Sequence, residues 1–369
     1  MDGAKMNVES IARYGLKRMM RHLGILLGVC ITCFFIIEAI PLDWRIRSRF
    51  SLFLVYIDPE EYRERYIRYG FEMGLLEEDG TPIPVLKRFL QWIGFMKNNK
   101  GEYNGLLQGK LGISLTEFNK TVESVIMPNV WFTILFNTFS FTILTITTIF
   151  VGTIFFITRN VDSKDDSKKE ISQRIIILPV FVLSIFFIVV FSQVFGVEIV
   201  NNDNAIVEPF ILNKELYKYL ILPTYILILW ATLFAIKITA NNAKKILTIK
   251  YQTKMNESSF TQREKIGVIV KSQSLFCFLY FRNNLSIIYS ILSLIEVIFK
   301  LPGLGTMVKI YGWQRDLPSL LACMILYSLI LIIHKFLMDM ILACFDSRIL
   351  SGEIKFNNAT ISNRWIHHY

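Results

Sequence analysis

This sequence lacks the motifs that mark most enzymes and metal proteins. It has only four histidines, none of them in a His-Glu-x-x-His pattern, and it has no Gly-x-Ser-x-Gly. The glycine-rich stretch 303–309 lacks the Gly-Lys-Ser/Thr ending of a phosphate-binding loop. Of the five cysteines, Cys30 and Cys33 fall inside an apolar run, where we interpret them as small buried residues. We therefore expect no catalytic residue, no metal and no cofactor.

Charged residues are scarce in six long stretches. Hydrophobic residues make up 53% of the 369 positions, and the mean hydropathy is +0.44. A helix that crosses a hydrocarbon core about 30 Å thick needs roughly 20 mainly apolar residues. The pattern predicts an all-α integral membrane protein with about six transmembrane helices. The runs are Leu23–Pro41, Val130–Thr158, Ile175–Val200, Leu220–Thr239, Leu285–Phe299 and Ser319–Phe345.

Basic residues flank these runs and set the expected topology. They crowd before residue 23 and after residue 348, which places both termini in the cytoplasm by the positive-inside rule. We expect a cytoplasmic N-terminus at 1–22, an anchor helix at 23–41, an extracytoplasmic segment at 42–127, a membrane domain at 128–345 and a cytoplasmic tail at 346–369. The net charge of +10 is explained by basic residues that flank the apolar runs, where they set the topology and face anionic lipid headgroups. We therefore expect the lipid bilayer as a partner and no binding of nucleic acid.

The expected extracytoplasmic segment contains two helical patterns. Asp58–Gly70 begins with an acidic residue and a proline, which is typical of a helix start. Asp79–Pro84 is a turn, and Val85–Met96 follows as a second helix able to pack on the membrane surface. The apolar face of this second helix comprises Leu86, Phe89, Leu90 and Ile93.

The segment 240–284 is polar and basic but keeps apolar residues in helical register. We expect short cytoplasmic helices here. Two interpretations stay open: the helices dock on a cytoplasmic partner, or they lie against lipid headgroups.

Four separated patterns resemble the permease subunits of the dipeptide, oligopeptide and nickel ABC importers. The first lies in 69–114 and ends in Gly109-Lys110-Leu111-Gly112-Ile113-Ser114, and the second, in 125–133, contains Pro128 and Thr133. The third and most specific runs from Glu296 through Pro302-Gly303-Leu304-Gly305 to Asp316-Leu317-Pro318. The fourth is Asp339 followed by Asp346-Ser347-Arg348. Their order and spacing agree across nearly the whole chain.

This resemblance implies a permease that lines a translocation pathway for peptides or a similar small solute. It implies three kinds of partner: a second permease (a related chain or a copy of this one), cytoplasmic ATPases that hydrolyse the ATP, and an extracytoplasmic solute-binding protein. It also assigns roles to residues. An outer gate or binding-protein contact is implied for Gly109, Gly112, Ser114, Glu296, Pro302, Gly303, Gly305 and Asp316. ATPase coupling is implied for Arg263, Glu264, Gly267 and Arg282. The resemblance also implies that three residues lie at the cytoplasmic end of the last helix: Asp339, Asp346 and Arg348.

Two departures from the family pattern favour a different function. Lys110 stands where the family usually has Asp, and 240–284 fits the family's coupling loop only with extra residues. If coupling is retained, Gly267 suits a sharp bend between two helices, although a glycine that simply ends a helix is the commoner explanation. The alternative is a membrane-anchored sensor or assembly factor that no longer engages an ATPase. An ion-driven transporter is disfavoured, because the middle of the apolar runs is almost wholly apolar or hydroxylic.

The last expectations concern single ionisable residues and the source. Lys335 and Asp339 are spaced to pair on one helix face, or else extend toward the cytoplasmic boundary. We expect Glu38 and Glu296 near the outer ends of their helices. The abundance of Ile, Lys, Asn and Phe is typical of a low-GC genome, which favours a bacterial cell membrane.

Overall fold

The computed structural model describes residues 8–47, 58–99, 101–116, 120–158, 186, 189–190, 220–233, 235 and 261–345. This part of the chain is mostly helical and contains no β-strand. Four of its helices are long and apolar enough to cross a bilayer, so the prediction of a helical membrane protein is confirmed. These four candidate spans are Ala12–Glu38, Val122–Ile154, Ile269–Ile298 and Leu317–Ala343.

The count of six spans is not reached within the described residues. The run that we predicted at 220–239 contains a helix, but Leu220–Leu233 is shorter than a membrane span. Most of the run at 175–200 lies outside the described residues.

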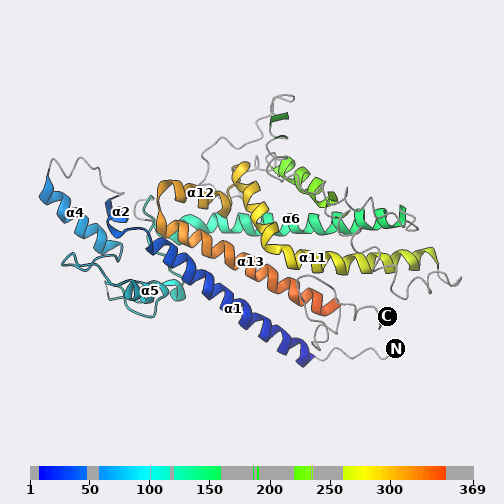
Figure 1. The fold of residues 1–369 in the computed structure, drawn as a ribbon, viewed down its shortest axis with the longest axis horizontal. Helices are drawn as coiled ribbons and strands as arrows, with labels where there is room; N and C mark the ends of the chain where they lie inside the picture. Colours follow the sequence, from blue (N-terminus) through cyan, green and yellow to red (C-terminus); the bar gives the residue numbers. More distant parts are fainter. Residues whose placement is uncertain are drawn as a thin grey trace. The chain divides into compact units, whose positions relative to one another are not determined.

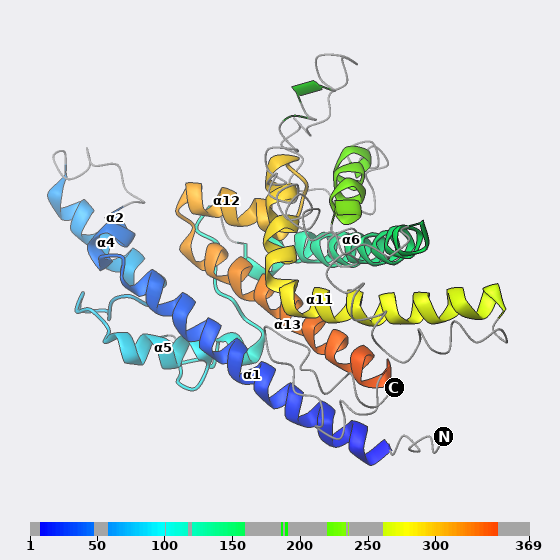
Figure 2. The same cartoon turned by 45° about the vertical axis from the view of Figure 1, so that its right-hand side comes forward.

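The chain divides into two compact units, and three long helices contribute to both. The first unit comprises Met1–Leu23, Phe132–Leu301 and Ile330–Tyr369, and the second comprises Gly24–Trp131 and Pro302–Leu329. Figures 1 and 2 show the described helices in chain order from blue to red.

Helix α1 (Val8–Glu38) begins well before the anchor helix that we predicted at 23–41. Much of the expected cytoplasmic segment 1–22 is therefore helical. The physical reason is that Arg and Lys are good helix formers, so a basic stretch need not end a helix. The C-terminal boundary was predicted more closely, because Pro41 follows soon after the last turn.

Helices α2 (Leu42–Arg47) and α4 (Pro59–Glu72) belong to the second unit. The predicted start of α4 is confirmed: the Asp58 carboxylate caps the helix by accepting a 2.9 Å hydrogen bond from the Glu61 backbone N–H. Leu75 and Leu76 then fold back on Ile46 of α2 to form a small apolar core. Gly70 is required at this contact, because a Cβ there would lie 2.4 Å from a methyl carbon of Leu76.

Helix α5 (Val85–Ile93) confirms the second predicted helix, but it ends three residues before Met96. Gly94 ends it with a left-handed φ of 99°, a conformation that glycine adopts without steric cost. A short 3₁₀ helix, η1 (Leu106–Gln108), follows, with Gly109 left-handed at its end.

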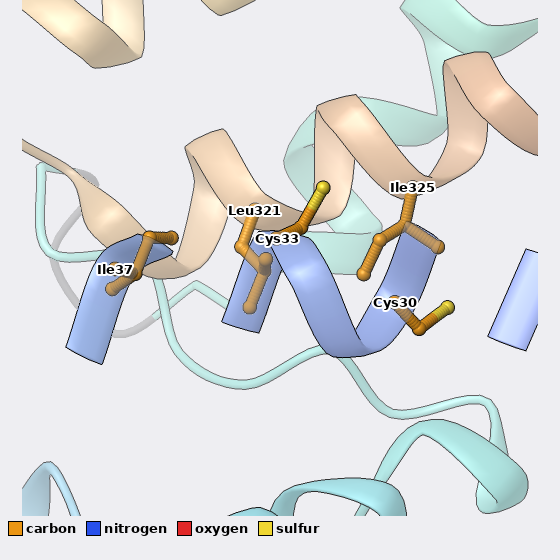
Figure 3. Packing of buried hydrophobic residues seen from close by; sticks show 5 residues of the cluster. All are labelled: Cys30, Cys33, Ile37, Leu321 and Ile325. Carbon is orange, nitrogen blue, oxygen red and sulfur yellow. The ribbon is translucent and has the colours of Figure 1, made fainter. Parts of the chain in front are cut away.

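An apolar core of the second unit forms where α1 contacts α13 (Leu317–Phe345). Figure 3 shows Cys30, Cys33 and Ile37 of α1 facing Leu321 and Ile325 of α13. Trp92 and Leu106 pack against this cluster from α5 and η1. The interpretation of the two cysteines as small core residues agrees with their burial as free thiols.

Helix α6 (Val122–Thr158) and helix α11 (Gln262–Ile298) supply most of the described first unit. The aromatic rings of Phe141 and Phe281 meet edge to face, with centroids 5.5 Å apart, and this contact joins the two helices. Helix α12 (Leu304–Gln314) follows in the second unit.

Helix α11 corrects our prediction of short helices across 240–284. From Gln262 onward the segment is one continuous helix that runs through both Gly267 and Arg282, while 241–260 lies outside the described residues. A glycine inside a helix costs only about 1 kcal/mol relative to alanine, which is too little to break a well-packed helix. The sharp bend that we proposed at Gly267 is therefore wrong.

Candidate functional site

The most densely bonded predicted site residue is Asp316, which is fully buried in the second unit. Its Oδ2 atom accepts four hydrogen bonds: 2.7 Å from Ser114 Oγ, 2.9 Å from Leu115 N, 3.1 Å from Thr116 N and 2.9 Å from Thr116 Oγ1. Its Oδ1 atom accepts a 3.2 Å bond from Ser319 N. Because a buried carboxylate is costly unless its oxygens are hydrogen-bonded, this arrangement fixes segment 114–116 onto the start of α13.

Local sequence explains both halves of this contact. Asp316 occupies the N-cap position of α13, where its backbone oxygen accepts a 2.9 Å bond from Leu320 N and Pro318 stands in the first turn. On the other side, Gly112 has a φ of 104° and its carbonyl accepts a 3.0 Å bond from Val122 N at the start of α6. The left-handed glycine turns Ser114 toward the carboxylate.

The other residues assigned to an outer gate lie at chain reversals. Gly109 and Gly112 are exposed left-handed positions. Gly303 is the N-cap of α12, and its carbonyl accepts a 3.1 Å bond from Met307 N. Pro302 is half-buried before it and Gly305 is buried in the first helical turn. The structure thus brings Ser114 and Asp316 together, and their burial makes them a clasp within the chain, not a contact surface.

Glu296 belongs to the first unit and is also fully buried. Thr133 Oγ1 donates a 3.1 Å hydrogen bond to its Oε1 atom, which connects the third motif to the second within this unit. The residue lies three positions from the end of α11, and Glu38 is the last residue of α1, so both occupy helix ends as expected.

A second buried carboxylate, Asp339 of α13, is the centre of an ion cluster in the first unit. Arg282 Nε of α11 lies 2.6 Å from its Oδ1 atom. Its Oδ2 atom is 3.2 Å from His22 Nε2, 3.4 Å from Arg18 Nη1 and 3.6 Å from Arg21 Nη2, all on α1. One side chain thereby ties α1, α11 and α13 together.

This cluster corrects the expectation for Lys335. Within the described residues, the ion pairs of Asp339 are made with Arg18, Arg21, Arg282 and His22, and Lys335 is not among them. The carboxylate is fully buried among these partners and lies four residues before the end of the candidate span at Ala343. The physical reason is that a charge in a membrane span is stabilised by partners on neighbouring helices, which spacing along one helix does not reveal.

The predicted coupling residues do not gather at one place. Arg263, Glu264 and Gly267 lie exposed in the first two turns of α11, before the candidate span begins at Ile269. Arg282 is 15 positions further along the same helix, about 22 Å at 1.5 Å per residue, and its guanidinium is buried against Asp339. Arg282 is therefore a link between helices and not an exposed docking residue.

A capping box begins α11. The Glu264 carboxylate accepts bonds of 2.9 Å from Thr261 N and 2.8 Å from Thr261 Oγ1, and this lowers the pKa of Glu264 below its ordinary value. Thr261 Oγ1 in turn accepts from Glu264 N over 3.4 Å. Glu264 thus has a structural role at the helix start, which the sequence pattern Thr-x-x-Glu could have indicated.

Sequence reasoning missed two contacts with α13, a buried one made by α1 and a partly buried one made by α11. The His22–Asp339 contact escaped because His22 was placed before the first span, although Arg18 and His22 share a helix face at a spacing of four. The second is the hydrogen bond between the Tyr289 hydroxyl and His334 Nδ1. Asp346 and Arg348 lie outside the described residues.

No candidate metal site is found among the described residues. No group of three or more His, Cys, Asp or Glu side chains among them is placed to hold a metal ion. No protein-family model matches the chain, and no curated protein matches it.

Proposed function

We propose that this chain is a permease subunit of an ABC importer in a bacterial cell membrane. The observation that carries the proposal is the hydrogen bond from Ser114 to Asp316. These two residues come from separate motifs of the resemblance, 202 positions apart, and the fold closes one on the other. If the two motifs resembled the family only by chance, their residues would not be expected to be in contact. The contact between Ser114 and Asp316 therefore supports the view that both motifs belong to one fold.

The ATPase partner would bind the first two turns of α11. Arg263, Glu264 and Ile266 are exposed there, and the capping box holds the helix start in place. The α-helical backbone continues to Ile298, and Figures 1 and 2 show that the helix bends along its course. A displacement of the first turns would therefore be carried along the part of α11 before the bend. ATP held between the partner subunits would favour one position of α11 over the other.

The Asp339 cluster would transmit this displacement to other helices. Arg282 moves with α11, and its bond to Asp339 connects that motion to α13 and, through His22 and Arg18, to α1. A buried ion pair resists separation because each charge left alone in the membrane is costly. The three helices then respond together in the first unit.

A second permease, either a related chain or a copy, would complete the pathway, and a solute-binding protein would deliver the cargo. A peptide or a similar small solute is the cargo that the resemblance favours. The extracytoplasmic loops that would receive the binding protein begin at the exposed left-handed glycines Gly109 and Gly112.

One observation favours the second candidate, a membrane-anchored sensor or assembly factor. Helix α11 passes straight through Gly267, and Arg282 is engaged inside the chain. A coupling loop that has become a plain helix is compatible with a permease scaffold that no longer binds an ATPase.

Purification of the tagged full chain in a mild detergent separates the two candidates. The importer proposal predicts that ATPase subunits and a second permease are recovered with the chain in fixed proportion, and that the complex hydrolyses ATP. Recovery of the chain without any ATPase, from cells that express its genomic neighbours, would contradict the importer and favour the sensor.

A further inference from the structure

Residues 85–109, which we name the anchor segment, pack against the apolar part of two candidate membrane spans. The Phe34 ring of α1 lies 5.1 Å from the Phe89 ring and 5.2 Å from the Trp92 ring, between centroids. Trp92 and Leu106 also contact the cluster that contains Cys30 and Ile325. All of these contacts lie within the second unit.

The depth of this contact in a bilayer follows from helix geometry. Cys30 lies eight residues before Glu38, the charged end of its span, which is about 12 Å along the axis at 1.5 Å per residue. Ile325 lies nine residues after the α13 cap Asp316, about 13 Å along that helix. Trp92 contacts Phe34, which lies four residues or about 6 Å before Glu38. Trp92 and Leu106 pack against the cluster that extends to Cys30 and Ile325, so these side chains lie below the surface of a hydrocarbon core about 30 Å thick.

Three large apolar side chains of the anchor segment are uncovered within the described chain. Leu86 is 66% exposed, Phe95 is 65% exposed and Leu107 is 63% exposed. Exposure of this size at three large side chains of one short segment is unfavourable in water and favourable in lipid. We propose that the anchor segment lies within the bilayer leaflet at the Glu38 end of α1, with these side chains among the lipid acyl chains.

Two side-chain amides bond backbone groups of the anchor segment between α5 and η1. At membrane depth an irregular chain must satisfy its own polar groups, because water is absent. Gln108 donates from Nε2 to the Gly94 carbonyl over 3.2 Å and accepts from Gly105 N over 3.1 Å. Gln91 Nε2 donates to the Lys97 carbonyl over 2.9 Å. Side-chain amides thereby close the loop between α5 and η1.

Charges at the same level match lipid headgroups. The Glu38 carboxylate is paired with Arg45 over 2.9 Å and with Arg88 over 2.7 Å, so two guanidinium groups surround one carboxylate. Exposed Lys97 lies with its ammonium 5.7 Å from the Tyr103 ring centroid. This excess of positive charge complements phosphate, while the aromatic rings suit the interfacial zone. The phospholipid bilayer is thus the partner of this surface, for an importer subunit and an uncoupled scaffold alike.

Spin labelling in liposomes tests the proposal. The full chain is reconstituted in vesicles of phosphatidylcholine and phosphatidylglycerol with one substitution at a time, Leu86→Cys, Phe95→Cys or Leu107→Cys, and a nitroxide is attached. Glu64→Cys, on the exposed polar face of α4, is the matched control. The unmodified chain is labelled in parallel, and its signal is subtracted as background. Weak background labelling is expected from its described cysteines, which are all buried: Cys30, Cys33, Cys277 and Cys323.

The measured quantity is the ratio of collision rates with oxygen, which concentrates in lipid, and with a water-soluble nickel chelate. We expect this ratio to be severalfold higher at each of the three anchor positions than at Glu64→Cys. A ratio equal to that of the control would place the segment in water and overturn the proposal. Exclusion of both reagents would mean that protein covers the surface, which also overturns it. Since the three positions are exposed, the substitutions leave the packing unchanged.

Discussion

The Ser114 hydroxyl donates a hydrogen bond of 2.7 Å to the Asp316 carboxylate, which is fully buried and accepts four further bonds. The carboxylate therefore holds the loop before α6 against the start of α13. The clasp lies entirely in the second unit, so its effect on stability is separable from that of the Asp339 cluster in the first.

Removal of the Asp316 carboxylate should strongly destabilise the protein. In Asp316→Ala, the donors of Ser114, Leu115 and Thr116 lose their acceptor, and α13 loses its cap, so we expect a loss of about 3 kcal/mol in the free energy of unfolding. Ser114→Ala removes one bond and should cost about 1 kcal/mol. Unfolding in mixed micelles measures both. Equal effects of the two substitutions would contradict the clasp.

Because of the Asp339 cluster, substitutions at two residues one turn apart on α13 should differ in their effect on the free energy of unfolding. Asp339→Ala removes the carboxylate that faces the buried guanidinium of Arg282 and should cost about 3–5 kcal/mol. Lys335→Ala, the matched control, should change stability by less than about 1 kcal/mol. The double variant Arg282→Ala with Asp339→Ala should be more stable than Asp339→Ala alone, because it no longer buries a guanidinium that has lost its carboxylate. A double variant that is less stable would refute the pairing.

Two glycines of the second unit should respond oppositely to alanine. A Cβ on Gly105 would lie 2.4 Å from the Gly94 backbone nitrogen, so Gly105→Ala must push apart the two ends of the loop in the anchor segment. Gly28 in α1 has no atom within 4 Å of that position, and Gly28→Ala should be neutral or stabilise by up to about 1 kcal/mol. Proteolysis within 94–105 should accelerate only in Gly105→Ala. The same rate in both variants would argue against the close approach.

The capping box of α11 predicts a pH dependence. Hydrogen bonds from Thr261 lower the pKa of Glu264 below its ordinary 4.5, so the ionised form is the one that stabilises the folded helix start. The contribution is therefore present above pH 4.5 and is lost as the pH falls through the lower folded pKa. Hydrogen exchange of residues 261–270, corrected for intrinsic rates, should show protection that disappears in this acidic range.

Thr261→Val is the control for this prediction. It removes the hydroxyl and with it two of the three hydrogen bonds between Thr261 and Glu264, so the first turn should exchange faster at neutral pH and its exchange should depend less on acid. Unchanged protection in Thr261→Val would show that the box does not stabilise the helix start.

Local signals made part of the fold predictable. Asp58 followed by Pro59 indicated the start of α4. The end of α5 at the left-handed Gly94 was missed, because the predicted helix ran on to Met96. Apolar length alone identified most of the membrane helices. The extension of α1 to Val8 was missed because the predicted helix was started at Leu23, where the apolar run begins. The helix propensity of the basic residues before Leu23 was not considered.

Contacts between distant helices were harder to predict. Ser114 and Asp316 were each selected from a motif, but nothing in either motif says that they touch. The pairing of Arg282 with Asp339 crosses 57 positions and depends on how α11 faces α13, which a single sequence does not encode in any spacing. The continuity of α11 was missed because the polar and basic residues of 240–284 favoured several short helices over one long helix.

The most direct test of the importer proposal is ATP hydrolysis by the purified complex with a substitution at Gly267. Gly267→Pro removes a helical hydrogen bond and disrupts the first turns of α11, whereas Gly267→Ala fits an open position and keeps the helix. The proposal predicts that the proline variant loses its ATPase subunits and the activity, while the alanine variant keeps both. Full activity with bound ATPase in Gly267→Pro, or no ATPase with any variant, would contradict it.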